Sequence, residues 1–230
     1  WAGSSPSSAS FRRRMARATF VLGVDPAFPG RGVAFALLDA DARLLRLGRQ
    51  EGYVDLLSLA QGLAAEVIAI DAPLGLPLGW GCLDLPCTCG RCQTGPSARR
   101  AAERALARLG IGVMWTTKRT ILRPLVEWAM AQRQALEKAG KEVIEVYPYA
   151  SKVALLGRPP ARKTTAVGRQ WLQIGLSRWV HGLPTDRLLS HDELDAVVAA
   201  YTAILWRHGD ACALGRPEDG VIVVPCPILT

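Results

Sequence analysis

Residues 19–50, TFVLGVDPAFPGRGVAFALLDADARLLRLGRQ, predict the beginning of a β-sheet. Three runs of β-branched and aliphatic residues, 19–25, 32–38 and 44–50, alternate with a Pro- and Gly-rich turn and with the polar turn Asp39–Ala42. Runs of this length joined by short turns indicate a three-stranded antiparallel meander. The first strand of this meander ends on an acidic residue, Asp25.

The rest of the chain alternates between predicted helices and predicted strands. Apolar spacing and helix-end residues predict helices over 55–65, 97–109, 120–139, 167–180 and 191–206, with Ser97 as a candidate N-cap. Short aliphatic runs predict strands over 67–70 and 143–146, and an edge strand over 220–225. This order predicts one α/β domain over residues 19–230, built on a mixed sheet.

The composition fits one folded domain without a membrane segment. Of the 230 residues 50% are hydrophobic, which is enough for one sizeable core. No apolar run reaches the roughly 20 residues of a bilayer helix, and no secretory signal pattern is present, so we expect a cytoplasmic protein. Half of the net charge of +8 comes from Arg12, Arg13, Arg14 and Arg17, in a Ser-rich stretch without acids. Residues 1–18 are therefore a predicted disordered basic leader, and the body is only mildly basic.

Acidic residues follow the ends of several apolar runs, at Asp25, Asp71, Glu145, Asp192 and Asp195. Carboxylates held on neighbouring strands and on one helix face can form a cage for two Mg²⁺ or Mn²⁺ ions, which hydrolyse phosphodiesters. We expect Asp25 and Asp71 to be ligands, with Asp195 rather than Asp192 completing the cage. Glu145 could bind metal, orient water or pair with an Arg. Taken singly, these acids could also be turn or capping residues.

The order of these elements resembles the ribonuclease H-like fold, which ribonuclease H, retroviral integrases and RuvC-type junction resolvases share. In that fold the first acid lies in the first strand, as Asp25 does, the second at the fourth strand, as Asp71 does, and the last on the C-terminal helix. The segment from Asp192 to Ala196, DELDA, resembles the D-x-x-D-A motif of the RuvC-type terminal helix.

Five motifs in order are similar to the family catalogued as domain of unknown function 429, a family of predicted nucleases of ribonuclease H fold. They are GVDPA, IDAPLGLP, the 99–110 helix, EVYPYASK and HDELDAVVAAYTA, and the resemblance spans about residues 21–225. It implies a ribonuclease H-like mixed sheet, an antiparallel meander plus parallel strands, flanked by helices and carrying a cysteine-rich insert. The resemblance does not supply an activity, because the description of the family as nucleases is itself an inference from the fold.

Basic and aromatic residues near the acids are candidate substrate contacts. Basic side chains embedded among hydroxyl residues suit phosphate binding, although each could also be a solvated surface residue; they are Lys118, Arg119, Lys152 and Lys163. Tyr147 and Tyr149 could stack on bases, whereas we expect Trp115 to lie in the core.

A cysteine-rich insert, residues 79–96, contains Cys82, Cys87, Cys89 and Cys92 in the pattern C-x4-C-x-C-x2-C. Clustered thiols separated by Pro and Gly suit tetrahedral zinc, but this is not the spacing of a standard zinc ribbon. Three states stay open: bound zinc, free or redox-responsive thiols, and a disulfide. Any zinc would be structural, because four thiolates leave no open coordination position. A rigid zinc loop following Asp71 would also border the acidic cleft.

Taken together, the sequence predicts a metal-dependent nuclease that acts on DNA or RNA, with Mg²⁺ or Mn²⁺ as cofactor and no membrane partner. One alternative is a nucleic-acid-binding or scaffold protein that has the fold without turnover. Another is a phosphotransferase of the actin-like ATPase fold, suggested by the turn after Asp25, which lies where those proteins place a phosphate loop. Against it, such a fold is built from two similar halves and this chain has one, and the chain has no Walker-type motif. The oligomeric state is open.

Overall fold

A computed structural model describes residues 19–27, 30–93 and 98–227, so the predicted leader, residues 1–18, and the candidate cap Ser97 lie outside the described residues. The strands are β1 (Phe20–Pro26), β2 (Val33–Leu38), β3 (Leu44–Gln50), β4 (Ala65–Ile70), β5 (Glu142–Glu145), β6 (Ala211–Arg216) and β7 (Gly220–Pro225). The helices are α2 (Leu56–Gly62), α3 (Ala101–Arg108), α4 (Arg123–Lys138), α5 (Pro148–Leu156), α6 (Ala166–Leu176), α7 (His191–His208) and the 3-10 helix η1 (Pro217–Asp219).

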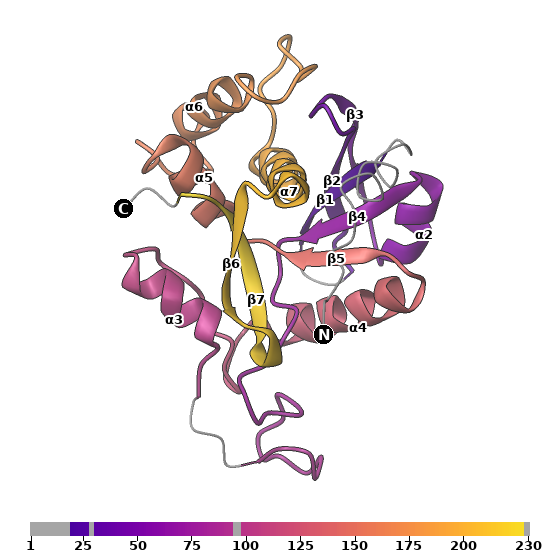
Figure 1. The fold of residues 1–230 in the computed structure, drawn as a ribbon, viewed down its shortest axis with the longest axis vertical. Helices are drawn as coiled ribbons and strands as arrows, with labels where there is room; N and C mark the ends of the chain where they lie inside the picture. The colour runs from indigo at the N-terminus through magenta and orange to yellow at the C-terminus, as the bar shows by residue number, and fades with distance from the viewer. Residues whose placement is uncertain (1–18, 28–29, 94–97, 228–230) are drawn as a thin grey trace, which may run out of the picture.

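Five strands form the main sheet in the order β3-β2-β1-β4-β5 (Figure 1). The strands β1, β2 and β3 pair antiparallel, whereas β4 pairs parallel to β1 and β5 pairs parallel to β4. The predicted meander and the ribonuclease H-like mixed sheet are thereby confirmed. In the register, Val24 faces Ile70, and the backbone N–H of Asp71 donates to the Val24 carbonyl at 2.9 Å. Asp25 and Asp71 therefore leave the same end of two adjacent parallel strands.

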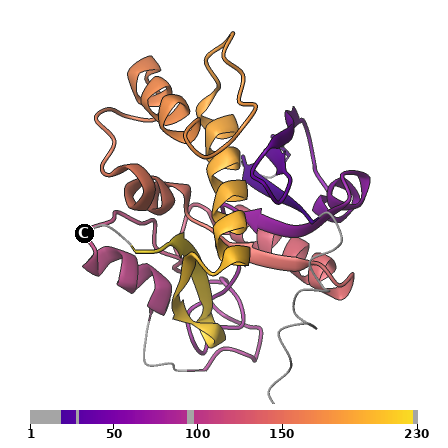
Figure 2. The same ribbon diagram turned by 45° about the horizontal axis from the view of Figure 1, so that its top comes forward.

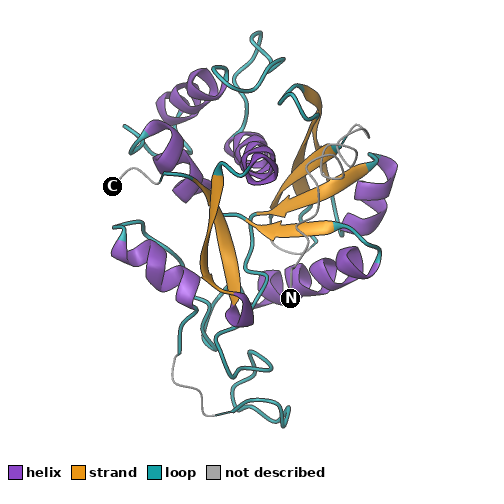
Figure 3. Ribbon diagram, in the orientation of Figure 1, coloured by secondary structure: helices purple, strands orange, loops and turns teal. Residues whose placement is uncertain are grey.

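Two apolar layers cover the two faces of this sheet. On one face, Val21, Val67 and Ala69 pack against residues of α7 and α6. Figure 2 shows α7 from the side, next to the sheet. On the other face, Leu22 and Ile68 pack against residues of α2 and α4. Successive residues of β1 and β4 point to opposite faces and most of both sets are buried, so this part of the sheet is a middle layer between helices (Figure 3).

The close contact between β1 and α7 depends on Gly23. A Cβ atom at this position would lie 2.1 Å from the carbonyl oxygen of Ala196 and 2.3 Å from the backbone nitrogen of Ala200. Helix α7 begins with a capping box formed by Ser190 and Glu193 and ends on Gly209 in the left-handed conformation. The two caps thus fix where α7 begins and ends, while Gly23 allows its close approach to the sheet.

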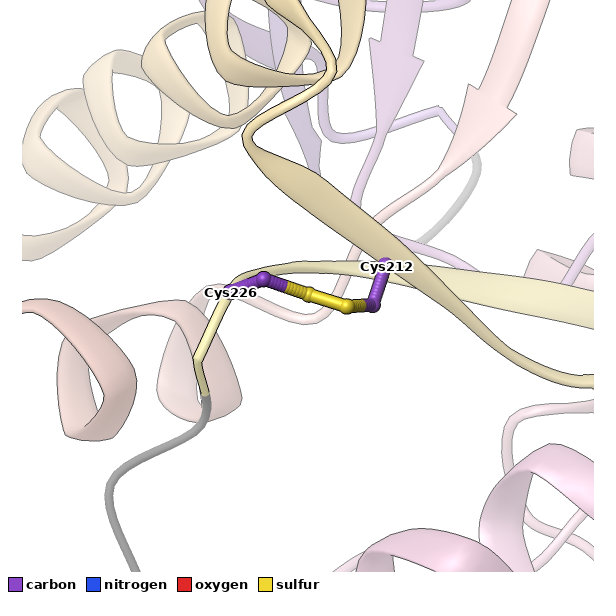
Figure 4. The surroundings of a disulfide bond; sticks show 2 residues. All are labelled: Cys212 and Cys226. Atoms are coloured by element: carbon purple, nitrogen blue, oxygen red, sulfur yellow. A yellow bond between two sulfur atoms is a disulfide. The ribbon is translucent and has the colours of Figure 1, made fainter.

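The C-terminal strands differ from the sequence prediction. Residues 220–225 form a strand, but β7 pairs with β6 in a separate two-stranded hairpin rather than joining the edge of the main sheet, which it touches through a bridge between Val223 and Val146. Figure 4 shows a disulfide between Cys212 of β6 and Cys226, just after β7. The sequence analysis predicted neither β6 nor this disulfide. Disulfides are rare in the cytoplasm, the location that the sequence analysis expected.

The helices also depart from the predicted ranges: α2 ends three residues early, and α3 and α4 begin four and three residues late. Helix α5 was not predicted, because the sequence analysis ended a strand at residue 146 and assigned no element to the residues after it, although Pro148 stands at the first helical turn, where a proline is accepted. Helix α6 ends at Leu176, before the predicted end at residue 180. Among the described residues, no helix combines the length and apolar character needed to cross a bilayer.

The Gly23 contact yields a stability prediction. Gly23→Ala forces a methyl group into the backbone of α7, so we expect a loss of about 1–3 kcal/mol in the free energy of unfolding, measured by chemical denaturation. The control is Gly62→Ala at the end of α2, where a Cβ would meet nothing within 4 Å and where alanine favours the helix. Equal stability of the two variants would contradict the proposed contact.

Candidate metal and nucleic-acid site

Three of the predicted acids come together from three separate elements. Asp25 lies in β1, Asp71 follows β4, and Asp195 lies in the second turn of α7. One carboxylate oxygen of each lies within 4.8 Å of those of the other two. The parallel pairing of β1 with β4 accounts for the first two, and the packing of α7 on β1 brings the third.

The charges of these acids are incompletely balanced. The Oδ2 atom of Asp25 is buried and has no hydrogen-bond partner among the described residues. Burial and then the carboxylates of Asp71 and Asp195 raise the pKa of Asp25 well above its ordinary value. Burial and Asp195 likewise raise the pKa of Asp71 to about 7. Carboxylates that repel one another in a poorly solvated place need an added cation, so the arrangement suits a metal ion.

Two lysines hold the third acid. The buried ammonium group of Lys152 on α5 contacts Oδ1 of Asp195, and Lys163, in the loop before α6, donates to Oδ2 at 2.8 Å. Partial desolvation alone would lower the pKa of Lys163, but Asp195, Asp25 and Asp71 raise it above its ordinary value. The side chain of Lys163 is 53% exposed, so this lysine is free to reach a ligand, whereas Lys152 is enclosed.

A cavity of about 590 Å³ opens beside the acids, a size common for small-ligand sites. Its lining combines charged and aromatic side chains: Asp71, Asp195, Lys152, Arg162, Lys163, Tyr147, Tyr149 and Trp171. The two tyrosine rings meet edge to face with centroids 6.1 Å apart, and the Tyr147 hydroxyl donates to the carbonyl of Gly112. Trp171 was missed by the sequence analysis because its spacing in α6 is that of an ordinary core residue.

Asp192 lies outside the group of three. Its carboxylate accepts from Arg49 at 3.1 Å and lies 2.6 Å from Nδ1 of His191. It is nevertheless close enough to add to the raised pKa of Asp25. Asp192 is therefore placed at the rim of the acidic site, paired with groups of its own.

Glu145 has a different environment from the three aspartates. Its two oxygens accept from the guanidinium of Arg100 at 2.7 and 2.6 Å, and Oε2 also accepts from the backbone of Leu74 at 2.8 Å. Arg100 is fully buried and donates through Nε to the carbonyl of Asp219. Of the three roles considered for Glu145, the structure favours the pairing with an arginine. No sequence signal marked Arg100, because a buried arginine is rare.

The structure places Lys118, Arg119 and Trp115 away from the cavity lining. The ammonium group of Lys118 donates to the carbonyl of Asp84 at 3.2 Å and lies 3.6 Å from the sulfur of Cys92. Arg119 is exposed on the segment before α4. The expectation that Trp115 is a core residue is wrong, because its ring is half-buried beneath the guanidinium of Arg99, 4.2 Å from the ring centroid.

The four insert cysteines form a second group of candidate ligands, with their sulfurs within 4.8 Å of one another. The expectation that this insert borders the acidic cleft is not supported, because none of its described residues lines the cavity. In Figure 1 the insert projects at the bottom of the view beyond α3 and α4, whereas α6 lies at the top.

Comparison with known proteins gives the family of the chain. Residues 23–219 match the family described as "Protein of unknown function (DUF429)". The chain belongs to DUF429. The resemblance inferred from the sequence is thereby confirmed, and the match includes all three converging aspartates. A search among curated proteins found no match to this DUF429 member.

Two solved structures of RuvC from Thermus thermophilus are similar to this DUF429 protein. The first is 15% identical with a TM-score of 0.42, covering 83% of this chain and 97% of RuvC. The second, RuvC in complex with a Holliday junction substrate, is 16% identical with a TM-score of 0.46, covering 88% of this chain and 99% of RuvC. At identities this low, function has to be argued from the site itself.

The raised pKa of Asp71 predicts how pH affects the metal-free protein. Between the unfolded pKa near 4 and the folded value of about 7, the folded state binds the extra proton, so stability falls as pH rises through this window. Asp71→Asn removes the titrating group. With a chelator present, we therefore expect the variant to gain stability over the parent between pH 5 and pH 8, on the order of 1–3 kcal/mol.

The measurement is urea denaturation at several pH values, with Asp41→Asn, an exposed turn acid, as the charge-matched control. Asp41→Asn is expected to follow the parent at every pH. A stability difference between Asp71→Asn and the parent that does not change with pH would show that Asp71 is not held near the other acids.

The Arg100–Glu145 pair predicts a large structural effect. Glu145→Gln removes the carboxylate that bonds the buried guanidinium twice and leaves the more distant Glu103, at 3.8 Å, so we expect a loss of about 3–5 kcal/mol in the free energy of unfolding. The matched control is Glu137→Gln, which breaks the exposed i,i+4 pair with Arg133 and costs less than about 1 kcal/mol. Thermal and chemical denaturation would distinguish these outcomes, and equal losses would reject the buried pair.

Proposed function

We propose that this DUF429 protein is a divalent-metal-dependent nuclease that hydrolyses phosphodiester bonds in DNA or RNA. The observation that carries the proposal is the convergence of Asp25, Asp71 and Asp195, with a buried oxygen of Asp25 that no donor satisfies. An acid placed to cap a helix accepts from a backbone N–H at the helix start, as Asp219 does from Ala101. The proposal assigns all three as metal ligands.

The donor set fits Mg²⁺ or Mn²⁺. Both ions favour carboxylate oxygens on rigid elements, and here the oxygens come from two paired strands and a capped helix. When bound between them, such ions would activate a water molecule and stabilise the leaving oxygen of a phosphodiester. The excess negative charge of the three aspartates is the physical reason for an ion to bind there.

The two lysines have separate roles in this proposal. Lys152 is enclosed and holds Oδ1 of Asp195, so it orients that carboxylate toward the other acids. Lys163 is half-exposed and bonded to the same carboxylate, so its ammonium group can transfer to a substrate phosphate when a metal ion takes over the charge of Asp195. Lys163 is thus the proposed phosphate contact of the site.

The cavity is the proposed position of the nucleotide next to the cleaved bond. Tyr147, Tyr149 and Trp171 provide flat apolar surfaces on which a base can stack, without preference for its sequence. Lys163 and Arg162 line the same cavity and provide positive charge for the backbone. This combination favours an unpaired nucleotide over one within a duplex, because a stacked base is not free to enter a cavity.

One observation favours the alternative of a binding protein without turnover. Asp195 is already neutralised by two ammonium groups, which compete with a metal ion for the same oxygens. In that case the lysines and aromatic rings would bind a nucleic acid strand while the aspartates contribute only to the fold. The alternatives differ in whether Mn²⁺ binds and whether the backbone is cut.

The test is a cleavage assay with end-labelled single-stranded, duplex and four-way-junction DNA and single-stranded RNA, with Mn²⁺ or with a chelator. We expect Mn²⁺-dependent cleavage by the parent chain and a loss of at least about 100-fold in Asp25→Asn and Asp71→Asn. Asp41→Asn, an exposed acid remote from the site, should retain parental activity.

Manganese binding, measured by calorimetry on the same proteins, separates the two hypotheses. Binding in the parent and in Asp41→Asn, but not in Asp71→Asn, supports the three-aspartate site. Nucleic-acid binding without manganese binding or cleavage would reject the nuclease and leave the alternative. Full cleavage by Asp25→Asn would reject the assigned ligands.

A further inference from the structure

The cysteine insert is ordered with almost no apolar core of its own. Its described part, residues 79–93, contains no helix or strand, and Leu83 is its one buried side chain. A loop that buries one leucine gains roughly 2–3 kcal/mol from that side chain, much less than the cost of ordering about 15 residues. Something other than hydrophobic burial must hold this segment together.

The four cysteine sulfurs occupy the corners of a compact group. The distances are 3.4 Å from Cys82 to Cys87, 3.5 Å from Cys87 to Cys89, 3.7 Å from Cys89 to Cys92 and 3.7 Å from Cys92 to Cys82. All four sulfurs lie within 4.8 Å of one another. A tetrahedron with Zn–S bonds of about 2.3 Å has edges of about 3.8 Å, so these spacings match four thiolates around one zinc ion.

The backbone around the sulfurs is arranged to support negatively charged thiolates. The N–H of Gly81 donates to Cys92 at 3.2 Å, and the N–H of Arg91 donates to Cys89 at 3.4 Å. Gly90, between Cys89 and Cys92, has the left-handed φ of +66° that closes the turn. A side chain at Gly81 would collide with Arg91, so the two arms of the loop need this glycine to approach.

A cation also stands beside the sulfurs. The ammonium group of Lys118 lies 3.6 Å from the sulfur of Cys92 and is anchored by the carbonyl of Asp84. Zinc with four thiolates has a net charge of −2, so a neighbouring lysine offsets part of it. Four neutral thiols would give the lysine no charge to offset and would leave the Asp84 carbonyl and the Trp80 ring, 5.4 Å away, as its other contacts. The same insert pairs the Asp84 carboxylate with Arg123, the first residue of α4.

The other states left open by the sequence fit less well. A disulfide requires sulfurs about 2.05 Å apart, and the four neighbouring sulfur pairs of the insert are 3.4 to 3.7 Å apart. Unligated thiols form only weak S–H hydrogen bonds, which do not explain four sulfurs converging on one point. The remaining pair of cysteines, Cys212 and Cys226, is joined elsewhere and takes no part.

We propose that Cys82, Cys87, Cys89 and Cys92 bind one structural zinc ion, which orders residues 79–93 and braces them against Lys118 and the start of α4. All four ligands come from the protein, so the ion has no open position and takes no part in catalysis. The site is independent of the proposed nuclease activity, because it shares no residue with the three aspartates.

The test is metal analysis of the full chain, purified under reducing conditions. We expect about one zinc per chain in the parent, by mass spectrometry of the metal, and less than about 0.2 in Cys89→Ser/Cys92→Ser. Two control variants should keep the parental zinc: Cys212→Ser/Cys226→Ser, which removes two other cysteines, and Asp25→Asn/Asp71→Asn, which removes the oxygen site. Zinc near zero in the parent, or zinc lost equally from the aspartate variant, would overturn the proposal.

Spectroscopy of the parent keeps the test valid if the cysteine variant does not fold. After replacement of zinc by Co²⁺, four thiolates should give intense sulfur-to-cobalt charge-transfer bands and tetrahedral ligand-field bands, and X-ray absorption of the zinc form should show four sulfurs at about 2.3 Å. Removal of zinc should raise amide hydrogen exchange in 79–93 and 115–123 while β1 and β4 keep their protection. Oxygen or nitrogen ligands in the absorption spectrum, or unchanged exchange, would overturn the proposal.

Discussion

The contact of β1 with α7 at Gly23 is the constraint on which the acidic site depends. Strand residues two apart face the same side of a sheet, so Gly23 and Asp25 both face α7. Because Gly23 has no side chain, the helix backbone at Ala196 reaches the strand directly, and the neighbouring Asp195 is brought to within a few ångströms of Asp25. A larger residue at this position would move the third carboxylate away from the other two.

The buried pair of Arg100 and Glu145 shows by contrast why the three aspartates are unusual. Arg100 bonds both oxygens of Glu145 and the carbonyl of Asp219, so this network joins α3, the end of β5 and the approach to β7. Leu74 bonds to Glu145 and lies three residues after Asp71, so the network also fixes the loop that leaves the acidic site. Both oxygens of Glu145 are bonded, whereas Asp25 has a buried oxygen without a donor in the described part of the chain and lies beside two further carboxylates, so negative charge accumulates at the aspartates, where a cation can bind.

The sequence predicted the strands and the helix of Asp195 from local signals, whereas the convergence of the acids also needed the resemblance to a known fold. Apolar runs ending on Asp25 and Asp71 indicated two strands, the ribonuclease H-like fold implied that these strands are neighbours, and the spacing of Asp192 and Asp195 placed both on one helix face. The partners of Glu145, Lys118 and Trp115 had no such signal, because their contacts join residues far apart in the chain. Strand β6 is short and half-exposed, and α5 begins on a proline, so neither has the periodicity on which the prediction relied.

The two groups of candidate ligands differ in chemistry as well as position. The carboxylates present hard oxygen donors at the junction of the sheet with α7, and the cysteines present soft sulfur donors in a loop without a core. Mg²⁺ and Mn²⁺ bind thiolates poorly, whereas zinc prefers them, so the donor types alone would direct different ions to the two places. Zinc held by four sulfurs would therefore remain bound while ions at the aspartates exchange, and the insert would keep its structure regardless of the state of the acidic site.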